Sequence, residues 1–219
     1  MAYSAGFSPH PKISYVGASP TGVASEAEYL EIGLARRVDP QAVRRELDAA
    51  LPPGLDITEA VEAGPGSLAE RMHAARWRIE FDAPAPEVAA ALAALLATSQ
   101  ALVERRTKDG RKLVDARAAI LAATVVDPGN GPEGHQRAIM DAVVRLTTPA
   151  IRPDDVLAAL AAVGGLARTV PARAVRLAQG PLDGSGGVSD PLALDRAMGV
   201  GPVGTGVRED ATQLDEANS

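Results

Sequence analysis

The sequence predicts an α+β protein made of two ferredoxin-like (split βαβ) units in tandem, the first N-terminally incomplete, with a disordered acidic tail. Three observations lead to this prediction. Apolar residues alternate in some short segments and recur every three to four residues in others, which indicates strands and helices. The order of these segments in the second half is that of a split βαβ unit with an extra hairpin. After Gly180 the periodicity ends and acidic residues accumulate.

Composition limits the classes of function. The 219 residues are 46% hydrophobic but only 3% aromatic, so the core is expected to be mostly alanine, valine and leucine. The chain has no cysteine, which excludes disulfides, thiolate zinc sites and an iron–sulfur cluster that it ligates itself. The net charge is −6, and residues 180–219 carry −5 of it. The rest of the chain is nearly neutral, so its charge is evidence neither for nor against nucleic-acid binding. With no membrane-length apolar run and no signal-like leader, we expect a cytoplasmic protein.

Residues 1–66 are expected to form an incomplete ferredoxin-like unit. The predicted elements are strands at 12–16 and 26–35, a helix between Asp39 and Pro52, and a strand at 55–63. Asp39 is a favourable N-cap and Pro40 suits the first helical position. The order strand–strand–helix–strand lacks the opening strand and helix of a complete unit, so one edge or face of its sheet would be uncovered.

Residues 67–179 are expected to form the second, complete unit. Its predicted elements are a short helix from Ser67, a strand at 75–81, a helix at 84–98, a hairpin and long strand at 101–126, a strand at 138–148, a helix at 152–164 and a strand at 172–179. The short helix opens with a capping-box pattern, Ser67 to Glu70. Residues 180–219 are expected to be a disordered acidic tail, with docking of a short helix at 190–199 as the alternative.

The segment GFSPHPKIS, Gly6–Ser14, is the first candidate site. Its glycine permits unusual backbone geometry and its two prolines fix φ, so the loop is stiff. A stiff loop would hold His10 and Lys12 in set directions, which suits anion capture or proton transfer. An ordered crossover into a strand explains the same residues without a function. The candidate binding residues are Gly6, Phe7, His10 and Lys12, together with Glu26 and Glu28 if the next strand folds back beside them.

The predicted hairpin is the second candidate site. A two-residue turn at Asp109-Gly110 would place Lys108 opposite Arg111 and Glu104 opposite Asp115. The tip would be a basic arm for phosphates or for an acidic partner, or simply a solvated hairpin. The candidate binding residues are Lys108, Arg111, Lys112, Asp115 and Arg117.

Three motifs resemble a known family. They are YSAGFSPHPKISY at 3–15, PTGVASEAEYLEI at 20–32 and KDGRKLVDAR at 108–117. These residues are similar to the radical-SAM-associated (radical-SAM-linked) proteins of unknown function, over roughly residues 3–179. Members occur beside, or fused to, a cobalamin-binding-type radical SAM protein. They usually carry an arginine-rich strand and helix before the first motif, whereas here Met1 lies two residues ahead of Tyr3, so we expect a late start or a truncation.

Three functions follow as hypotheses. The resemblance implies an accessory or substrate-binding partner of a cobalamin-binding-type radical SAM enzyme, without redox chemistry of its own. No cofactor would be bound by this chain, and the partner would carry the iron–sulfur cluster, S-adenosylmethionine and cobalamin. The alternatives are a stand-alone RNA-binding module, which the scarcity of aromatic residues weakens, and an acid–base enzyme that uses His10 and Lys12. No membrane partner is expected.

Overall fold

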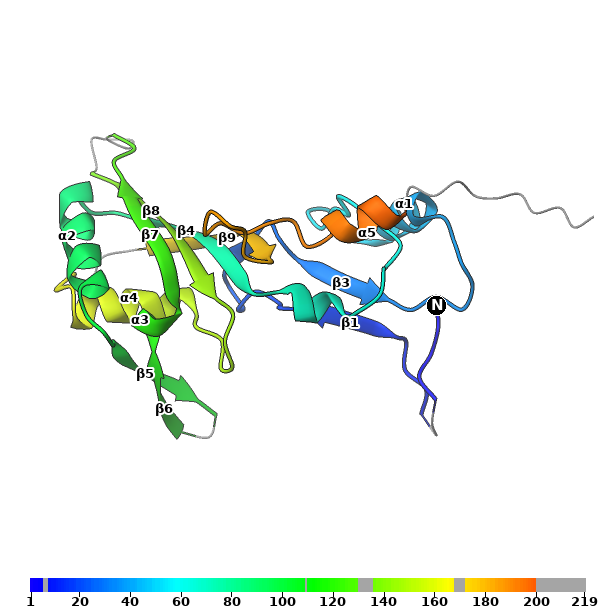
Figure 1. The fold of residues 1–219 in the computed structure, drawn as a ribbon, viewed down its shortest axis with the longest axis horizontal. Coiled ribbons are helices and arrows are strands. Elements are labelled where there is room, and N and C mark those ends of the chain that lie inside the picture. Colours follow the sequence, from blue (N-terminus) through cyan, green and yellow to red (C-terminus); the bar gives the residue numbers. More distant parts are fainter. Residues whose placement is uncertain (6–7, 109, 130–135, 168–171, 200–219) are drawn as a thin grey trace, which may run out of the picture.

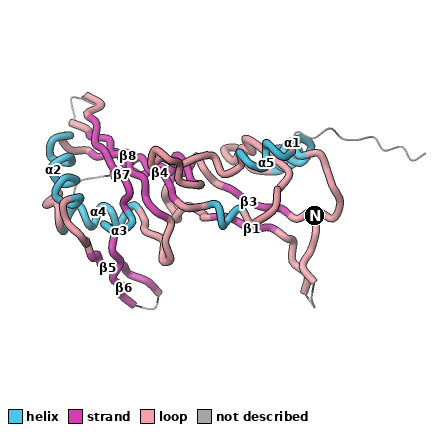
Figure 2. Tube along the Cα trace, viewed as in Figure 1, coloured by secondary structure: helices cyan, strands magenta, loops and turns pink. Residues whose placement is uncertain are grey.

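The computed structural model describes residues 1–5, 8–108, 110–129, 136–167 and 172–199. Figure 1 shows an elongated molecule of the mixed α+β class, as predicted. A five-stranded sheet with covering helices forms one end, and a two-stranded sheet with helices α1 and α5 forms the other. Figure 2 shows that loops make up much of the second end, between and around β1 and β3.

The five-stranded sheet has the order β2-β9-β4-β8-β7. Its strands are β2 (Ala24–Ser25), β9 (Ala172–Gly180), β4 (Ala74–Phe81), β8 (Ala138–Arg145) and β7 (Ile120–Val126). Strands β9, β4, β8 and β7 pair antiparallel, and β2 joins β9 in parallel. The predicted strands of the second half are therefore present, and a strand from the first half extends the same sheet.

Helices α2 (Ala85–Leu96) and α4 (Pro153–Ala162) cover one face of this sheet (Figure 1). Three residues of β4 were expected to point inward, and all are buried: Trp77, Ile79 and Phe81. Ile79 and Phe81 share a core cluster with Val88, Leu92 and Leu95 of α2, and Trp77 packs with neighbours across the sheet. Alanine occupies many of the remaining core positions. Small side chains let the helices approach the sheet closely, which is how a core so poor in aromatics is filled.

The hairpin of β5 (Leu102–Thr107) and β6 (Gly110–Asp115) has a different register from the predicted one. Thr107 lies opposite Gly110 and Arg106 opposite Arg111, whereas the prediction set Lys108 opposite Arg111; Asp109 of the predicted turn lies outside the described residues. Val103 lies opposite Val114 in this register, and both are buried. The long strand expected after the turn is also wrong: it is interrupted by α3 (Ala116–Ala119) before β7 begins.

The other end of the molecule is built on β1 (Ile13–Val16), β3 (Tyr29–Ile32) and α1 (Pro40–Ala50). The two strands pair antiparallel, and the side chain of Asp39 caps α1 as expected. The strand predicted at 55–63 is wrong, because these residues form no strand in the structure. Without it this half has two strands in its own sheet, and its third, β2, belongs to the large sheet.

The prediction of a disordered tail from Gly180 is wrong for residues 180–199. Gly180 ends β9, and the chain then returns along the molecule to form α5 (Ala193–Met198) near α1 (Figure 1). Asp195 of α5 is 3% exposed, and it accepts hydrogen bonds from Arg71 at 2.7 Å and from the backbone N–H of Gly64 at 3.0 Å. The structure therefore agrees with the alternative prediction, a short helix at 190–199 that docks on the rest of the molecule. Residues 200–219 lie outside the described residues.

Arg176 of β9 joins the two ends of the molecule. Its side chain is 3% exposed and donates to the Gly17 carbonyl, to the Ser25 hydroxyl at 3.1 Å and to the Glu28 carboxylate. The guanidinium also lies over the Trp77 ring, 5.7 Å from its centroid. A buried cation is tolerated only when its donors are satisfied, so these contacts hold residues 17–28 at one position on the sheet.

Gln179 completes this junction. It is fully buried, and its amide nitrogen donates to the carbonyls of Val16 at 3.3 Å and Ala27 at 2.7 Å. Gly17 has φ +59° and lies so close that a Cβ there would be 2.5 Å from the Gln179 side-chain oxygen. Only glycine combines this backbone conformation with this approach.

We expect Gly17→Ala to lower the free energy of unfolding by about 2–4 kcal/mol, from the left-handed backbone and the displacement of the buried Gln179 amide. Gly22→Ala is the matched control: Gly22 also has positive φ, +84°, but nothing lies within 4 Å of its Cβ position. Its loss should be about 1 kcal/mol. Urea denaturation of both variants measures the difference, and equal losses would contradict the packing argument.

We expect Asp195→Ala to lower the free energy of unfolding by about 3 kcal/mol at neutral pH, because Arg71 loses its buried partner. Burial alone raises the pKa of the Asp195 carboxyl, but the hydrogen bonds from Arg71 and Gly64 outweigh it and lower the pKa. The stabilisation is therefore complete above the unfolded pKa of about 4 and is lost as the pH falls through the folded pKa.

Melting curves of wild type and Asp195→Asn from pH 7 to pH 3 check this dependence. The difference between the two proteins should shrink as the pH falls below about 4. A difference that stays constant over this range would show that the Asp195 charge contributes nothing to docking of α5.

Candidate functional site

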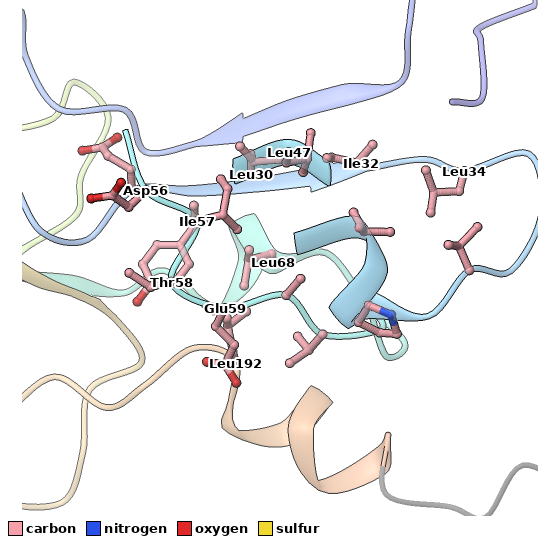
Figure 3. Close-up of a pocket in the computed structure, with 17 residues that line it drawn as sticks. Leu30, Ile32, Leu34, Leu47, Asp56, Ile57, Thr58, Glu59, Leu68 and Leu192 are labelled. Carbon is pink, nitrogen blue, oxygen red and sulfur yellow. The ribbon is translucent and has the colours of Figure 1, made fainter. Parts of the chain in front are cut away.

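An apolar groove lies between β3, α1, residues 56–61 and the start of α5, at the end of the molecule away from the large sheet (Figure 3). Its volume is about 210 Å³. The labelled side chains of Leu30, Ile32 and Leu47 come from β3 and α1, and Leu68 and Leu192 come from later segments (Figure 3). Residues distant in sequence thus converge on one concave, mostly apolar surface.

The groove is open because other segments cover helix α1 only in part. None of its residues is buried, although Val43 and Leu47 face the groove. A second hollow, of about 640 Å³, lies on the same helix and shares Ile32, Leu34 and Val38 with the groove. An amphipathic helix normally buries its apolar stripe, so α1 has apolar surface available for further contacts.

Apolar exposure is concentrated in this half of the chain. Among the described residues the exposed large hydrophobic side chains number 14, and nine of them lie between residues 1 and 55. They are Met1, Tyr3, Ile13, Tyr15, Leu30, Leu34, Val38, Leu51 and Leu55. Three of them, Leu30, Leu34 and Val38, line the groove.

Carboxylates give the groove an acidic side. Glu28, Asp56 and Glu59 line it, and no basic residue does. Glu28 is paired with Arg176, and Glu59 accepts two hydrogen bonds from Arg196 at 2.8 and 2.6 Å. The hydrogen bond from Arg196 lowers the pKa of Glu59, so this carboxyl is ionised at neutral pH. The site suits a ligand that is apolar along its length and cationic at the acidic side.

Tyr29 brings a hydroxyl to the same side of the groove. Its half-buried position raises the pKa of the phenol, and the nearby carboxylates of Asp190 and Glu59 raise it further, against smaller opposing effects of Arg176 and Arg196. The phenol therefore stays protonated at neutral pH and can donate a hydrogen bond, but it does not serve as a base.

The structure places His10 and Lys12 outside this groove. Residues 2–4 run antiparallel to residues 10–12, so the proline segment is the tip of an exposed hairpin. The backbone N–H of His10 donates to the Ser4 hydroxyl at 3.0 Å, and both His10 and Lys12 are exposed. Gly6 and Phe7, also candidates, lie outside the described residues.

Glu26 and Glu28 do not meet His10 and Lys12. Lys12 is hydrogen-bonded to Gly33 through the backbone, whereas Val16 lies opposite Tyr29 at the other end of the β1–β3 pair. At about 3.3 Å per residue, roughly 13 Å of strand separates the two ends. Glu28 instead binds Arg176, and the backbone N–H of Glu26 donates to the Arg176 carbonyl at 2.8 Å.

The hairpin candidates divide into two groups. Asp115 caps α3, accepting from the backbone N–H groups of Ala101 and Arg117, and the Arg117 side chain donates to the carbonyls of Leu96 and Ile120. Both side chains therefore stabilise the fold. Near the tip, Arg111 pairs with Glu104 at 3.1 Å, and Lys112 is exposed, as is Lys108.

Sequence reasoning missed the groove because its residues read as ordinary core positions. Val43 and Leu47 have the spacing of a buried helix face, and only the packing shows that the face is left open. The usable signal is an arginine between two apolar residues, Val175 and Leu177: when such an arginine is buried its donors require acceptors, and the half-exposed Glu28 carboxylate is one of them.

Residues 1–5, 8–108, 110–129, 136–167 and 172–199 contain no group of three or more His, Asp or Glu side chains that could hold a metal ion. Within the same ranges no helix combines the length and hydropathy needed to cross a bilayer.

One family model matches the chain. It is described as "Uncharacterized protein conserved in bacteria (DUF2344)" and covers residues 1–153, which include the groove apart from Leu192. No curated protein and no solved structure matches the sequence.

We expect Tyr29 to titrate above pH 10, because burial and the neighbouring carboxylates disfavour the phenolate. Ultraviolet titration of wild type and Tyr29→Phe checks this: the variant should lose the absorbance change at the highest pH. Glu59→Gln should lower the Tyr29 pKa, since it removes one of the carboxylates. A high-pH phase that persists in Tyr29→Phe would contradict the assignment.

Proposed function

We propose that this chain, which belongs to the DUF2344 family of uncharacterized bacterial proteins, is an accessory subunit that binds a protein partner and has no redox chemistry of its own. The observation that carries the proposal is the apolar groove with its acidic side, set in the half of the chain with most of the exposed large apolar residues. An exposed apolar surface of this kind lowers the solubility of a protein, and association with a partner would bury it.

The occupant we propose is an amphipathic helix of the partner with a basic residue at one end. Leu30, Val43 and Leu47 would contact its apolar stripe. Asp56 would face its arginine or lysine, because the other two lining carboxylates, Glu28 and Glu59, already pair with Arg176 and Arg196. The apolar contacts would supply most of the affinity and the charges the orientation.

The resemblance of residues 3–32 and 108–117 to radical-SAM-associated proteins supplies the candidate partner, a cobalamin-binding-type radical SAM enzyme. In this proposal the partner contributes the iron–sulfur cluster, S-adenosylmethionine and cobalamin, and the present chain contributes a docking or substrate-binding surface. The absence of cysteine from the sequence supports this division of roles, because a cluster needs thiolate ligands.

The large sheet supports a finer interpretation of the fold. Strands β9, β4, β8 and β7 follow the order expected of a ferredoxin-like unit, with α2 and α4 on one face and the β5–β6 hairpin as an insertion. We interpret this part as a ferredoxin-like scaffold. A second such unit in the first half stays a prediction, which would need a further strand and helix.

The acid–base alternative has a weaker basis. His10 and Lys12 lie on an exposed hairpin, and the glutamates proposed to work with them lie at the other end of β1 and β3. A catalytic pair needs its members within hydrogen-bond reach, or bridged by one water molecule. In the groove proposal His10→Ala and Lys12→Ala are expected to leave partner binding unchanged, whereas in the acid–base hypothesis the same substitutions would abolish turnover.

We expect Val43→Asp/Leu47→Asp to weaken partner binding at least tenfold, because unpaired carboxylates in an apolar interface cost more than about 1.4 kcal/mol. The partner probe is a recombinant cobalamin-binding-type radical SAM protein from the same genome, titrated by calorimetry. The second probe is a synthetic amphipathic helix with lysine at one end, compared with the same helix carrying glutamate there.

Ala49→Asp is the matched control for these substitutions. Ala49 is exposed on the same helix, two residues beyond Leu47 and therefore on the other side of it. Its effect on binding should be negligible, and circular dichroism should show all variants folded. Wild-type protein that binds neither probe, or a control variant as weak as the double variant, would overturn the groove proposal.

A further inference from the structure

The outer face of the five-stranded sheet is rich in arginine. Helices α2 and α4 cover the opposite face, where Ile79 and Met140 are buried (Figure 1). Alternation along β4 and β8 places the intervening residues on the outer face. Its charged side chains are Arg76, Arg78, Glu80, Asp141, Arg145 and Arg173, with Arg137 at the end of β8. The strands thus carry five arginines against two acids, and Arg137 pairs with Glu80 at 2.7 Å. A third acid, Asp183, lines the hollow on this face, which stays basic although the chain as a whole is acidic.

These arginines keep donors available. Asp141 lies between Arg76 and Arg78 at 3.6 and 3.7 Å, which is ion-pair contact but beyond a normal hydrogen bond. The Arg78 Nε and the Asp141 Oδ1 are buried atoms without a hydrogen-bond partner among the described residues, so the donors open to an anion are the exposed nitrogens of these guanidinium groups. The Arg76 and Arg78 side chains are 48% and 41% exposed, so an anion can reach them from solvent.

The face is also concave and partly apolar. A hollow of about 440 Å³ lies between β4, β7, β8 and the turn at residues 183–188, and its walls include Arg76 and Asp141. The neighbouring outward positions carry small or aliphatic side chains, namely Ala122, Ile139, Val143, Val175 and Ala178. The turn is held rigid because the Asp183 carboxylate accepts from Ser185 and Gly187.

We propose that this outer face binds single-stranded RNA. The five arginines would contact phosphates, and an arginine plane can also stack on an unpaired base. The aliphatic positions between the arginines give bases an apolar surface to lie on, in place of the aromatic side chains that single-strand binders commonly use. A duplex would present its phosphates but could not use this apolar floor, and an acidic peptide would leave it uncovered.

The site is distinct from the groove. The groove is acidic and lies beyond β3 and α1, whereas the arginine face belongs to the large sheet (Figure 1). The RNA proposal therefore does not rest on the partner proposal. Together they describe a chain that would hold a protein partner at one end and an RNA at the other.

The test uses the full chain and a short fluorescent single-stranded RNA, with anisotropy measured over a range of salt concentrations. We expect Arg145→Gln/Arg173→Gln to weaken binding roughly tenfold and to make the slope of log affinity against log salt shallower by about 1.4, two contacts at about 0.7 each. Neither arginine has an ion pair with a described residue, so the fold should tolerate the change.

Arg36→Gln/Arg45→Gln is the matched control, because it removes the same charge from exposed positions in the other half that also have no ion pair with a described residue. It should change neither affinity nor slope by a comparable amount. Absence of binding by wild type, an equal loss in the control pair, or tighter binding of a poly-glutamate peptide than of RNA would each overturn the proposal. Equal affinity for duplex RNA would overturn the role of the apolar floor.

Discussion

The arrangement of the whole molecule depends on the burial of one cation. Arg176 is 3% exposed, and a guanidinium in such a place is stable only when fixed oxygen atoms accept its hydrogens. Three acceptors, Gly17, Ser25 and Glu28, come from one short segment of the first half. An apolar contact of the same area would permit sliding, because apolar contacts are not directional. The arginine permits one position only, and Gln179 adds two further hydrogen bonds in the same place.

This polar junction explains why the groove is open. The first half attaches to the sheet through hydrogen bonds, the small β2 strand and a few apolar contacts, among them Val16 with Met72 and Val23 with the Trp77 cluster. Much of its other apolar surface stays exposed. The return of the chain to α5 closes one side, held by the Arg71–Asp195 pair and by Arg196 between Glu59 and Asp190. Helix α1 remains without a buried residue. A groove between such an incompletely covered helix and its sheet is a consequence of how the two halves are joined.

Much of the fold could be predicted from local sequence, and the errors have physical causes. The Asp39 cap, the Ser67–Glu70 capping box and the inward residues of β4 depend on neighbours within a few positions, and all were correct. Residues 55–63 alternate like a strand, but no partner strand is available to them. The hairpin register differs by two residues from the one predicted by the preferred turn pair, and such a shift keeps Val103 and Val114 on the same face, so the apolar pattern could not distinguish the two. Docking of α5 depends on Arg71 and Gly64, more than a hundred residues away in sequence, which no local pattern reveals.

The candidate sites were harder to predict than the elements, for the same reason. The two prolines do restrict the backbone of residues 8–12, but a restricted backbone does not determine which residues the loop faces. The register of β1 and β3 places the loop at the opposite end of the strand pair from Glu28. The groove and the arginine face are properties of surfaces assembled from segments of both halves or from several strands. The two surfaces differ in charge because folding separates residues of opposite charge. The carboxylates that line the groove come from residues 28–59, and arginines of β4, β8 and β9 lie on the outer face of the large sheet. If the groove and the sheet face bind the ligands proposed for them, the opposite charges of the two surfaces would keep each ligand from competing for the other site.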